Sequence, residues 1–248
     1  DANTTAHYNT GLGSQALSGN TTGASNVAVG HRSLLVNTTA ADNTGVGASS
    51  LAANTTGASN TGLGSGALAS NTTASNNTAV GKSALLLNTT GAGNTAVGTF
   101  TLDANTTGAT NTAIGYAALS ANTTATSNVA VGNSALLVNT SAALNVALGT
   151  EAGSGVTSGG GNTLIGYQAG VHDVALTTGA NNVVIGVYSN TSAVDSAKAI
   201  VIGYNVTGES DYTTIGSSAG ESRLAHGGTS WATVSDERVK KDIKDSTV

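Results

Sequence analysis

The sequence lacks three residue types altogether and is poor in several others. Its 248 residues include no Pro, Cys or Met, and only one Trp and one Phe. Without Cys, no disulfide framework can form, and the sequence leaves the redox compartment undetermined. Charged residues make up 8% of the chain, whereas typical proteins contain about 25%. The apolar residues are mostly Ala, Val and Leu, which predicts a thin core built from small side chains.

The scarcity of charge excludes several classes of partner. The net charge is −5, and Lys and Arg together number only eight, unlike the basic surface of a nucleic-acid-binding protein. No apolar run is long enough to span a bilayer, and no secretory signal pattern is present, so we expect no membrane insertion. The chain begins at Asp1, and we expect it to be a fragment of a longer protein.

Metal and cofactor sites have little basis in the sequence. The carboxylates are not clustered, and the four His residues occupy unrelated contexts, so we expect no metal site. The His residues are His7, His31, His172 and His226. No Gly-rich loop follows a strand and opens a helix. We therefore interpret the 34 Gly as structural residues and expect no cofactor.

A pentapeptide of the form Asn-Thr/Val-Gly/Ala-Leu/Val/Ile-Gly recurs every 17 residues from Asn9 to Asn162, and looser copies begin at residues 182, 199 and 212. A second motif, "NTT", follows each starting Asn by eleven residues, and at Asn139 it becomes "NTS". A period of 17 is too short for helical repeats of roughly 30 to 45 residues. It suits one turn of a β-solenoid, with two strands of about five residues and two tight corners. The sequence thus predicts an all-β fold, a parallel β-solenoid or β-roll with 17-residue coils.

The Gly that closes each pentapeptide falls where the chain must turn a corner. Gly tolerates positive φ or a close backbone approach there, which indicates a structural role. These corner residues are Gly13, Gly30, Gly47, Gly64, Gly81, Gly98, Gly115, Gly132, Gly149 and Gly166.

Stacked coils place equivalent residues above one another at about 4.8 Å. We expect the Val/Leu/Ile of each pentapeptide, and a Leu four residues after the first eight corner Gly, to form apolar ladders inside the solenoid. These Leu residues are Leu17, Leu34, Leu51, Leu68, Leu85, Leu102, Leu119 and Leu136. The Asn positions are expected to form amide ladders that satisfy one another and the corner backbone. Charge is scarce in the repeats because a repeated charge would lie directly over its own copy and be repelled.

Three coils extend the Leu site into "LLV" or "LLL", at residues 34–36, 85–87 and 136–138. These segments are 51 residues apart, which corresponds to three coils. They indicate either duplication of a three-coil block or patches that meet a partner at regular height, and the sequence leaves both interpretations open.

The composition divides the chain into four parts. Residues 1–166 form the regular solenoid. In residues 167–216 the repeat spacing changes to 20, 17 and 13, and Tyr and charged residues return, which predicts irregular coils that cap the stack. Residues 217–234 contain the only Trp, Trp231, and are interpreted as a neck or linker. Residues 235–248 form a separate charged segment.

The coil "NTAVGxxAL" resembles the head repeats of trimeric autotransporter adhesins. It is still more similar to the "NTAVG…AL…NTTG" arrays of phage tail-fibre proteins. This resemblance, over residues 1 to about 216, implies a homotrimeric structural or adhesive fibre. It implies an extracellular place in a virion tail fibre or, alternatively, on a bacterial surface as an adhesin head. The implied partners are further copies of the chain and a host-surface glycan or receptor.

The charged segment "SDERVKKDIK" resembles the start of the endosialidase-type intramolecular chaperone. Five positions of its "SDxRxKxxI" pattern match: Ser235, Asp236, Arg238, Lys240 and Ile243. The resemblance implies self-cleavage of the full-length precursor at the Ser235–Asp236 joint, with Ser235 and Lys240 as the catalytic pair. Only the first fourteen residues of that domain are present, so we expect this fragment to have no enzymatic activity.

Two rival functions come from other classes. An ice-binding solenoid would use a flat array of Thr at the second pentapeptide position, but Val27, Val129 and Val146 interrupt that array. The Thr residues concerned are Thr10, Thr44, Thr61, Thr78, Thr95 and Thr112. A glycan-cleaving enzyme would need paired carboxylates. Its best candidates are Glu209, Asp211 and Glu221.

Overall fold

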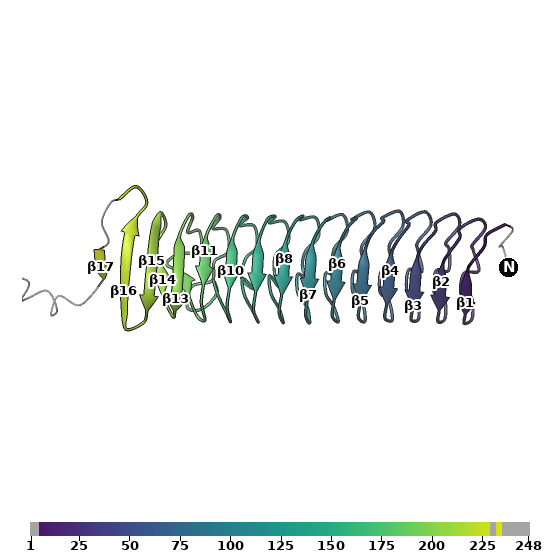
Figure 1. The fold of residues 1–248 in the computed structure, drawn as a ribbon, viewed down its shortest axis with the longest axis horizontal. Helices are drawn as coiled ribbons and strands as arrows, with labels where there is room; N and C mark the ends of the chain where they lie inside the picture. Colours follow the sequence, from purple (N-terminus) through teal and green to yellow (C-terminus); the bar gives the residue numbers. More distant parts are fainter. Residues whose placement is uncertain (1–4, 229–231, 235–248) are drawn as a thin grey trace, which may run out of the picture.

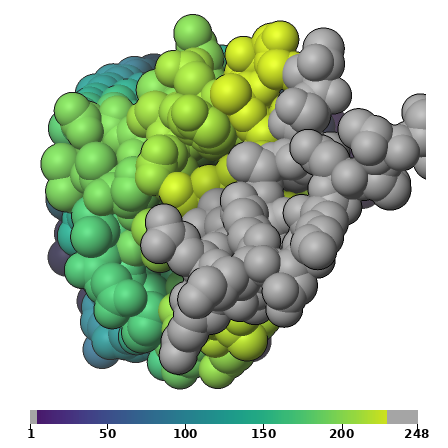
Figure 2. Space-filling view, turned by 90° about the vertical axis from the view of Figure 1, so that its left-hand side faces the viewer, coloured from purple at the N-terminus to yellow at the C-terminus, as the bar shows by residue number. Residues whose placement is uncertain are grey.

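The computed structural model describes residues 5–228 and 232–234, and all regular structure in them is β-strand (Figure 1). The main sheet has 15 strands, and successive coils supply neighbouring strands from β1 to β15 in parallel. Seen along the axis, the earlier coils lie behind the later ones (Figure 2). The expected parallel β-solenoid with 17-residue coils is therefore confirmed.

The regular coils each contribute one strand to this sheet. These strands are β1 Thr10–Leu12, β2 Val27–Val29, β3 Thr44–Val46, β4 Thr61–Leu63, β5 Thr78–Val80, β6 Thr95–Val97, β7 Thr112–Ile114, β8 Val129–Val131, β9 Val146–Leu148 and β10 Thr163–Ile165. The irregular coils and the C-terminal strands follow. They are β11 Val183–Ile185, β12 Asn190–Thr191, β13 Ile200–Tyr204, β14 Thr207–Gly208, β15 Tyr212–Ser217, β16 Gly220–Ala225 and β17 Ala232–Val234.

The expectation of two five-residue strands per regular coil is wrong. Each regular coil has a single three-residue strand, because the rest of the coil turns repeatedly through the left-handed region of φ. Ser83 and Leu85, for example, have φ of 58° and 52°. The backbone of this turning segment still bonds to the next coil, as when Leu85 N donates to Thr101 O at 3.0 Å. Stacking thus satisfies the buried backbone groups without a second strand.

Two Asn columns run through the interior, and both are buried. In the column that precedes the strands, the Asn77 side-chain oxygen accepts from the backbone N–H of Asn94 at 2.9 Å. In the "NTT" column, Asn88 Nδ2 donates to Asn71 Oδ1 at 2.9 Å. Both columns also donate to the same backbone carbonyl, since Asn77 Nδ2 and Asn88 Nδ2 each lie 2.9 Å from Gly91 O. The Asn ladders therefore replace much of a conventional apolar core.

The apolar interior consists of two narrow ladders. One is the Leu that lies four residues after the corner Gly, from Leu34 to Leu136, and the other is the small residue at the middle of strands β2 to β9, such as Ala79. The Val/Leu/Ile position of the pentapeptide was expected inside, and this is wrong. Because the Asn and the middle residue point inward, alternation turns the first and third strand residues outward. Leu63 and Leu148, for instance, are 45% and 46% exposed.

The interior changes where the repeat becomes irregular. Gly153 takes the place of the ladder Leu, and a Cβ there would lie 2.5 Å from Leu164 Cδ1. Leu164, at the middle of β10, therefore fills the space that the missing Leu leaves. The "NTT" Asn column likewise ends at Asn139, and buried Val156 and Leu176 occupy the next two coils. The stack then ends in antiparallel pairing of β15 with β16 and of β16 with β17.

Candidate functional surfaces

The corner glycines lie directly after the strands. From Gly13 to Gly166, all ten have φ between 127° and 140°, a region that L side chains rarely adopt. The next coil also approaches each of them closely. A Cβ on Gly81 would lie 2.4 Å from Gly98 O, so both backbone conformation and space exclude a side chain.

The outward face of the main sheet, which we call the strand face, consists of the first and third residues of strands β1 to β11, β13 and β15 in their common register. The first position holds Thr, Val or Ile, and the third holds Leu, Val or Ile in every coil. These side chains are half-buried or exposed. No charged residue interrupts the strand face, and its third positions form an apolar stripe along the stack beside a first column that is mostly Thr.

The "LLV" segments lie on another part of the surface. Their third residues, Val36, Leu87 and Val138, are exposed, and the residue before each is half-buried. The equivalent third positions in the neighbouring coils hold Gly, Ala or Ser, such as Gly19, Ala53 and Ser70. The structure thus places three separate aliphatic patches three coils apart.

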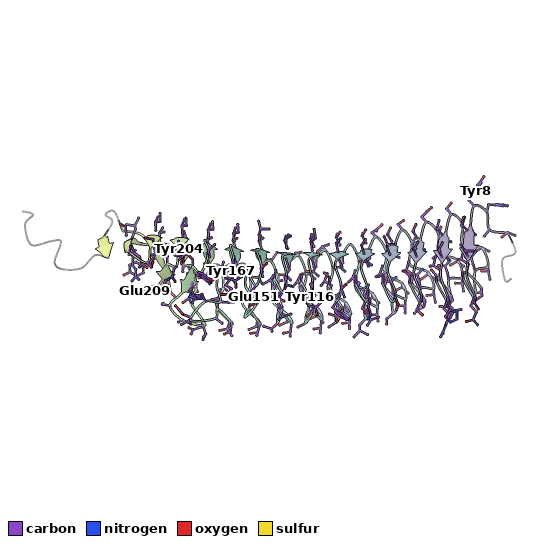
Figure 3. All side chains as sticks on the ribbon, turned by 90° about the horizontal axis from the view of Figure 1, so that it is seen from below. Tyr8, Tyr116, Glu151, Tyr167, Tyr204 and Glu209 are labelled. Atoms are coloured by element: carbon purple, nitrogen blue, oxygen red, sulfur yellow. The ribbon has the colours of Figure 1, made fainter. Side chains whose placement is uncertain are left out.

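An aromatic cluster, which we define as Glu151, Tyr167, Gln168, His172, Tyr188 and Tyr204, gathers at the irregular coils. Figure 3 shows Glu151, Tyr167 and Tyr204 following one another along the axis. The ring of Tyr188 contacts Tyr167, His172 and Tyr204, at centroid distances of 5.3, 4.4 and 6.3 Å.

Polar contacts tie the aromatic cluster together. Gln168 Nε2 donates to Glu151 Oε2 at 2.6 Å. Desolvation, with the neighbouring Tyr188 and Glu151, raises the pKa of the Tyr167 phenol. A Tyr hydroxyl is already neutral at physiological pH with its ordinary pKa of about 10, and the shift moves its ionisation further from that range.

The candidate catalytic carboxylates do not form a free pair. Arg223 Nη1 lies 2.6 Å from Glu209 Oε1, and Arg223 Nη2 lies 3.2 Å from Glu221 Oε2. One guanidinium thus binds both carboxylates. Asp211 contributes its backbone carbonyl to this end of the stack, where it accepts from His226 N at 2.8 Å.

The remaining expectations concern a metal site, a membrane-spanning segment and the self-cleavage residues. Within residues 5–228 and 232–234, no group of three or more His, Cys, Asp or Glu side chains is placed to hold a metal ion. The same part of the chain contains no helix with the length and apolarity needed to cross a membrane. Ser235, Asp236 and Lys240 lie outside the described residues, as does Trp231.

Sequence reasoning missed the strand face and the aromatic cluster. The strand face was missed because the aliphatic residue of the pentapeptide was assigned to the interior. The second had a visible signal, since the step from Asn162 to Asn182 is three residues longer than the repeat and Tyr residues gather there. Comparison of the chain with protein-family models, with curated proteins and with solved structures found no match.

Proposed function

We propose that this chain is a structural and adhesive segment of a homotrimeric surface fibre, in which the strand faces of three copies pack together. The observation that carries the proposal is the aliphatic residue at the third strand position of every coil. A contiguous row of half-buried and exposed aliphatic side chains, unlike scattered single ones, is typical of an interaction site. Burying it stabilises an assembly by roughly 25 cal/mol per Å² of apolar area.

The periodicity of the strand face favours a second copy of the chain as its partner. The stripe repeats at each coil, about 4.8 Å along the axis, and it continues from β1 to β15. A partner must match that spacing over the whole length, and an identical chain in parallel register does so. Closed cyclic symmetry then covers the face of every copy. The number three rests on the resemblance of the repeat to trimeric adhesin heads and phage tail fibres.

The same resemblance supports a place in a virion tail fibre, with a bacterial adhesin head as the alternative. A long, rigid and nearly uncharged stack is suited to holding a binding surface at a distance from the particle or cell that carries it. Adhesion requires, in addition, a surface that contacts a glycan or receptor.

Single-Cys variants test the packing, because the natural chain contains no Cys. Val97→Cys places a thiol at the third position of β6, and the matched control Thr90→Cys places one at an exposed site in the "NTT" segment of the previous coil. Under mild oxidation we expect disulfide-linked dimers of Val97→Cys and monomers of Thr90→Cys on a denaturing gel. Cross-linking at Thr90 with none at Val97 would contradict the packing.

Ice binding is the second candidate, and one observation favours it. Thr44, Thr61, Thr78, Thr95 and Thr112 form an uninterrupted outward Thr column on strands β3 to β7. A measurement of thermal hysteresis separates the two functions. The fibre proposal predicts none, whereas clear hysteresis that Thr78→Leu abolishes would favour ice binding.

We also propose that the longer precursor matures by self-cleavage, with Lys240 as the base that activates Ser235. This rests on the five residues that match the intramolecular-chaperone pattern. The wild-type precursor with the complete chaperone domain should give two bands, and Ser235→Ala and Lys240→Ala should each give one uncut band. Efficient cleavage of the Ser235→Ala precursor at this joint would overturn the mechanism.

A further inference from the structure

The aromatic cluster occupies the place where the repeat departs from its pattern. In the regular coils, the residue after the corner Gly is usually small or polar, such as Ser65, Thr99 or Thr150. In the aromatic cluster this position holds Tyr167 and Tyr204, which are 40% and 56% exposed. Most earlier coils stack without exposed aromatic rings. The regular coils hold one smaller aromatic pair, Phe100 with Tyr116 at 6.2 Å between centroids, whereas four rings meet in the aromatic cluster.

An insertion in the coil helps to build the aromatic cluster. In the preceding coil, Val156 N donates to Gly153 O at 3.0 Å. In the inserted coil the equivalent bond runs from Leu176 N to Gly170 O at 2.9 Å. The five residues 171–175 of the inserted coil thus replace the two residues 154–155 of the preceding coil.

The inserted segment carries His172 onto the ring of Tyr188, at 4.4 Å between centroids. Asn190, in the next coil, donates its side-chain amide to the backbone carbonyl of His172 and fixes the segment there. The insertion therefore adds a ring to the surface while the stack continues through it in parallel register.

Polar groups accompany the rings. The carboxylate of Glu151 accepts a hydrogen bond from the amide of Gln168, and these residues lie two coils and one coil before Tyr188, respectively. Such a pair keeps free lone pairs and an N–H that can bind adjacent hydroxyl groups. None of the members is Lys or Arg, and Glu151 carries a negative charge, so the aromatic cluster would repel phosphate, sulfate and other polyanions.

We propose that the aromatic cluster is a binding site for a neutral glycan chain that lies along the solenoid axis. A pyranose ring has an apolar face of C–H groups and a rim of hydroxyls. Tyr presents a large apolar ring with a polar tip, and binding sites combine such aromatic surfaces with a few placed polar groups. Successive coils repeat at about 4.8 Å, close to the length of one sugar unit. This inference rests on the adhesive part of the proposed function.

A glycan array that carries neutral and anionic oligosaccharides tests the site with the purified full chain. We expect binding to neutral oligosaccharides. We expect at least a tenfold loss of affinity for the strongest ligand in Tyr167→Ala and in Tyr204→Ala, and smaller losses in Tyr167→Phe, which keeps the ring. Tyr116→Ala is the matched control, because Tyr116 is an exposed Tyr at the same corner position three coils earlier, and it should bind like wild type.

Several results would overturn the site: no binding on the array, binding to anionic glycans alone, or binding unaffected in both Ala variants. Circular dichroism and the mass in solution show whether each variant keeps the wild-type fold and assembly. A monomeric protein that still binds through Tyr167 would refute the trimer and leave the site intact. A trimer that binds no glycan would refute the site alone.

Discussion

At the scale of single residues, neighbouring coils fit one another through small complementary substitutions. Where the middle of a strand is Gly, a Ser replaces the Ala of the preceding turn and fills the vacant space. Ser50 Oγ donates to Gly62 O at 2.8 Å, and a Cβ on Gly62 would lie 2.5 Å from that Oγ. In the next coil the same two positions hold Ala67 and Ala79, both fully buried. A Ser with a Gly and an Ala with an Ala therefore fill the same interior space in neighbouring coils.

A double-mutant cycle on Ser50 and Gly62 should reveal this coupling. Gly62→Ala alone overpacks the interior and should destabilise the protein by about 1–3 kcal/mol. Ser50→Ala with Gly62→Ala recreates the pair of the next coil and should recover most of that loss. Thermal unfolding of the four proteins measures the interaction. Additive effects of the two changes would show that the residues do not share the space.

The corner glycines make a second residue-scale prediction. Gly81→Val combines a β-branched side chain, a φ of 134° and a Cβ 2.4 Å from Gly98 O. We expect a loss of at least about 3 kcal/mol from strain and overlap. Gly11→Ala is the control, because a Cβ there meets no atom closer than 3.6 Å and equivalent strands carry Ala. An unchanged melting temperature of Gly81→Val would contradict the corner geometry.

At the scale of elements, the Asn columns hold the coils at a fixed height. From Asn37 to Asn122, each "NTT" Asn donates to the Asn one coil earlier at 2.8–3.0 Å. The bonds lie in a buried interior, where an unpaired polar group is costly. The column thus contributes stability only while each member can both donate and accept.

Asn88→Asp tests this requirement with almost no change of shape. A carboxylate cannot donate to Asn71 Oδ1 or Gly91 O, and its charge is buried, so we expect a loss of at least about 3 kcal/mol at pH 7. Burial should raise the pKa of the new Asp in the folded protein above its usual value of about 3.9. The loss of unfolding free energy should therefore shrink as the pH falls from 7 toward about 3.9, because the buried carboxyl becomes protonated and neutral. The control Asn133→Asp lies at an exposed corner. Equal, small effects of both changes would contradict the role of the column.

The sequence predicted the period, the parallel stacking and the Asn ladders, because each follows from repetition at a fixed step. It did not predict which face of the strand is buried. Alternation in "NTAVG" shows a period of two, but its phase depends on how much volume the coil encloses. The enclosed space accommodates Ala79 and the ladder Leu and leaves Val80 outside. The aromatic cluster escaped prediction because it depends on residues from four coils that meet only after stacking.

At the scale of the whole molecule, the stack behaves as a column of interchangeable units, since each coil contacts mainly its neighbours. Deleting residues 78–94 removes one complete coil and rejoins Asn77 to Thr95. We expect this variant to keep a cooperative melt within a few degrees of wild type. Deleting residues 78–93 removes one residue fewer and shifts the register, which turns outward side chains inward. Similar melting of both variants would refute the fixed register.

The mass of the protein in solution tests the central claim, that copies of this chain cover one another's strand faces. Light scattering after size-exclusion chromatography, at micromolar concentration, gives that mass independently of shape. We expect three times the 23.8 kDa of one chain, and a fall toward the mass of one chain when Val80 and Val97, both on the strand face, are replaced by Lys. A wild-type mass of 23.8 kDa would contradict the claim.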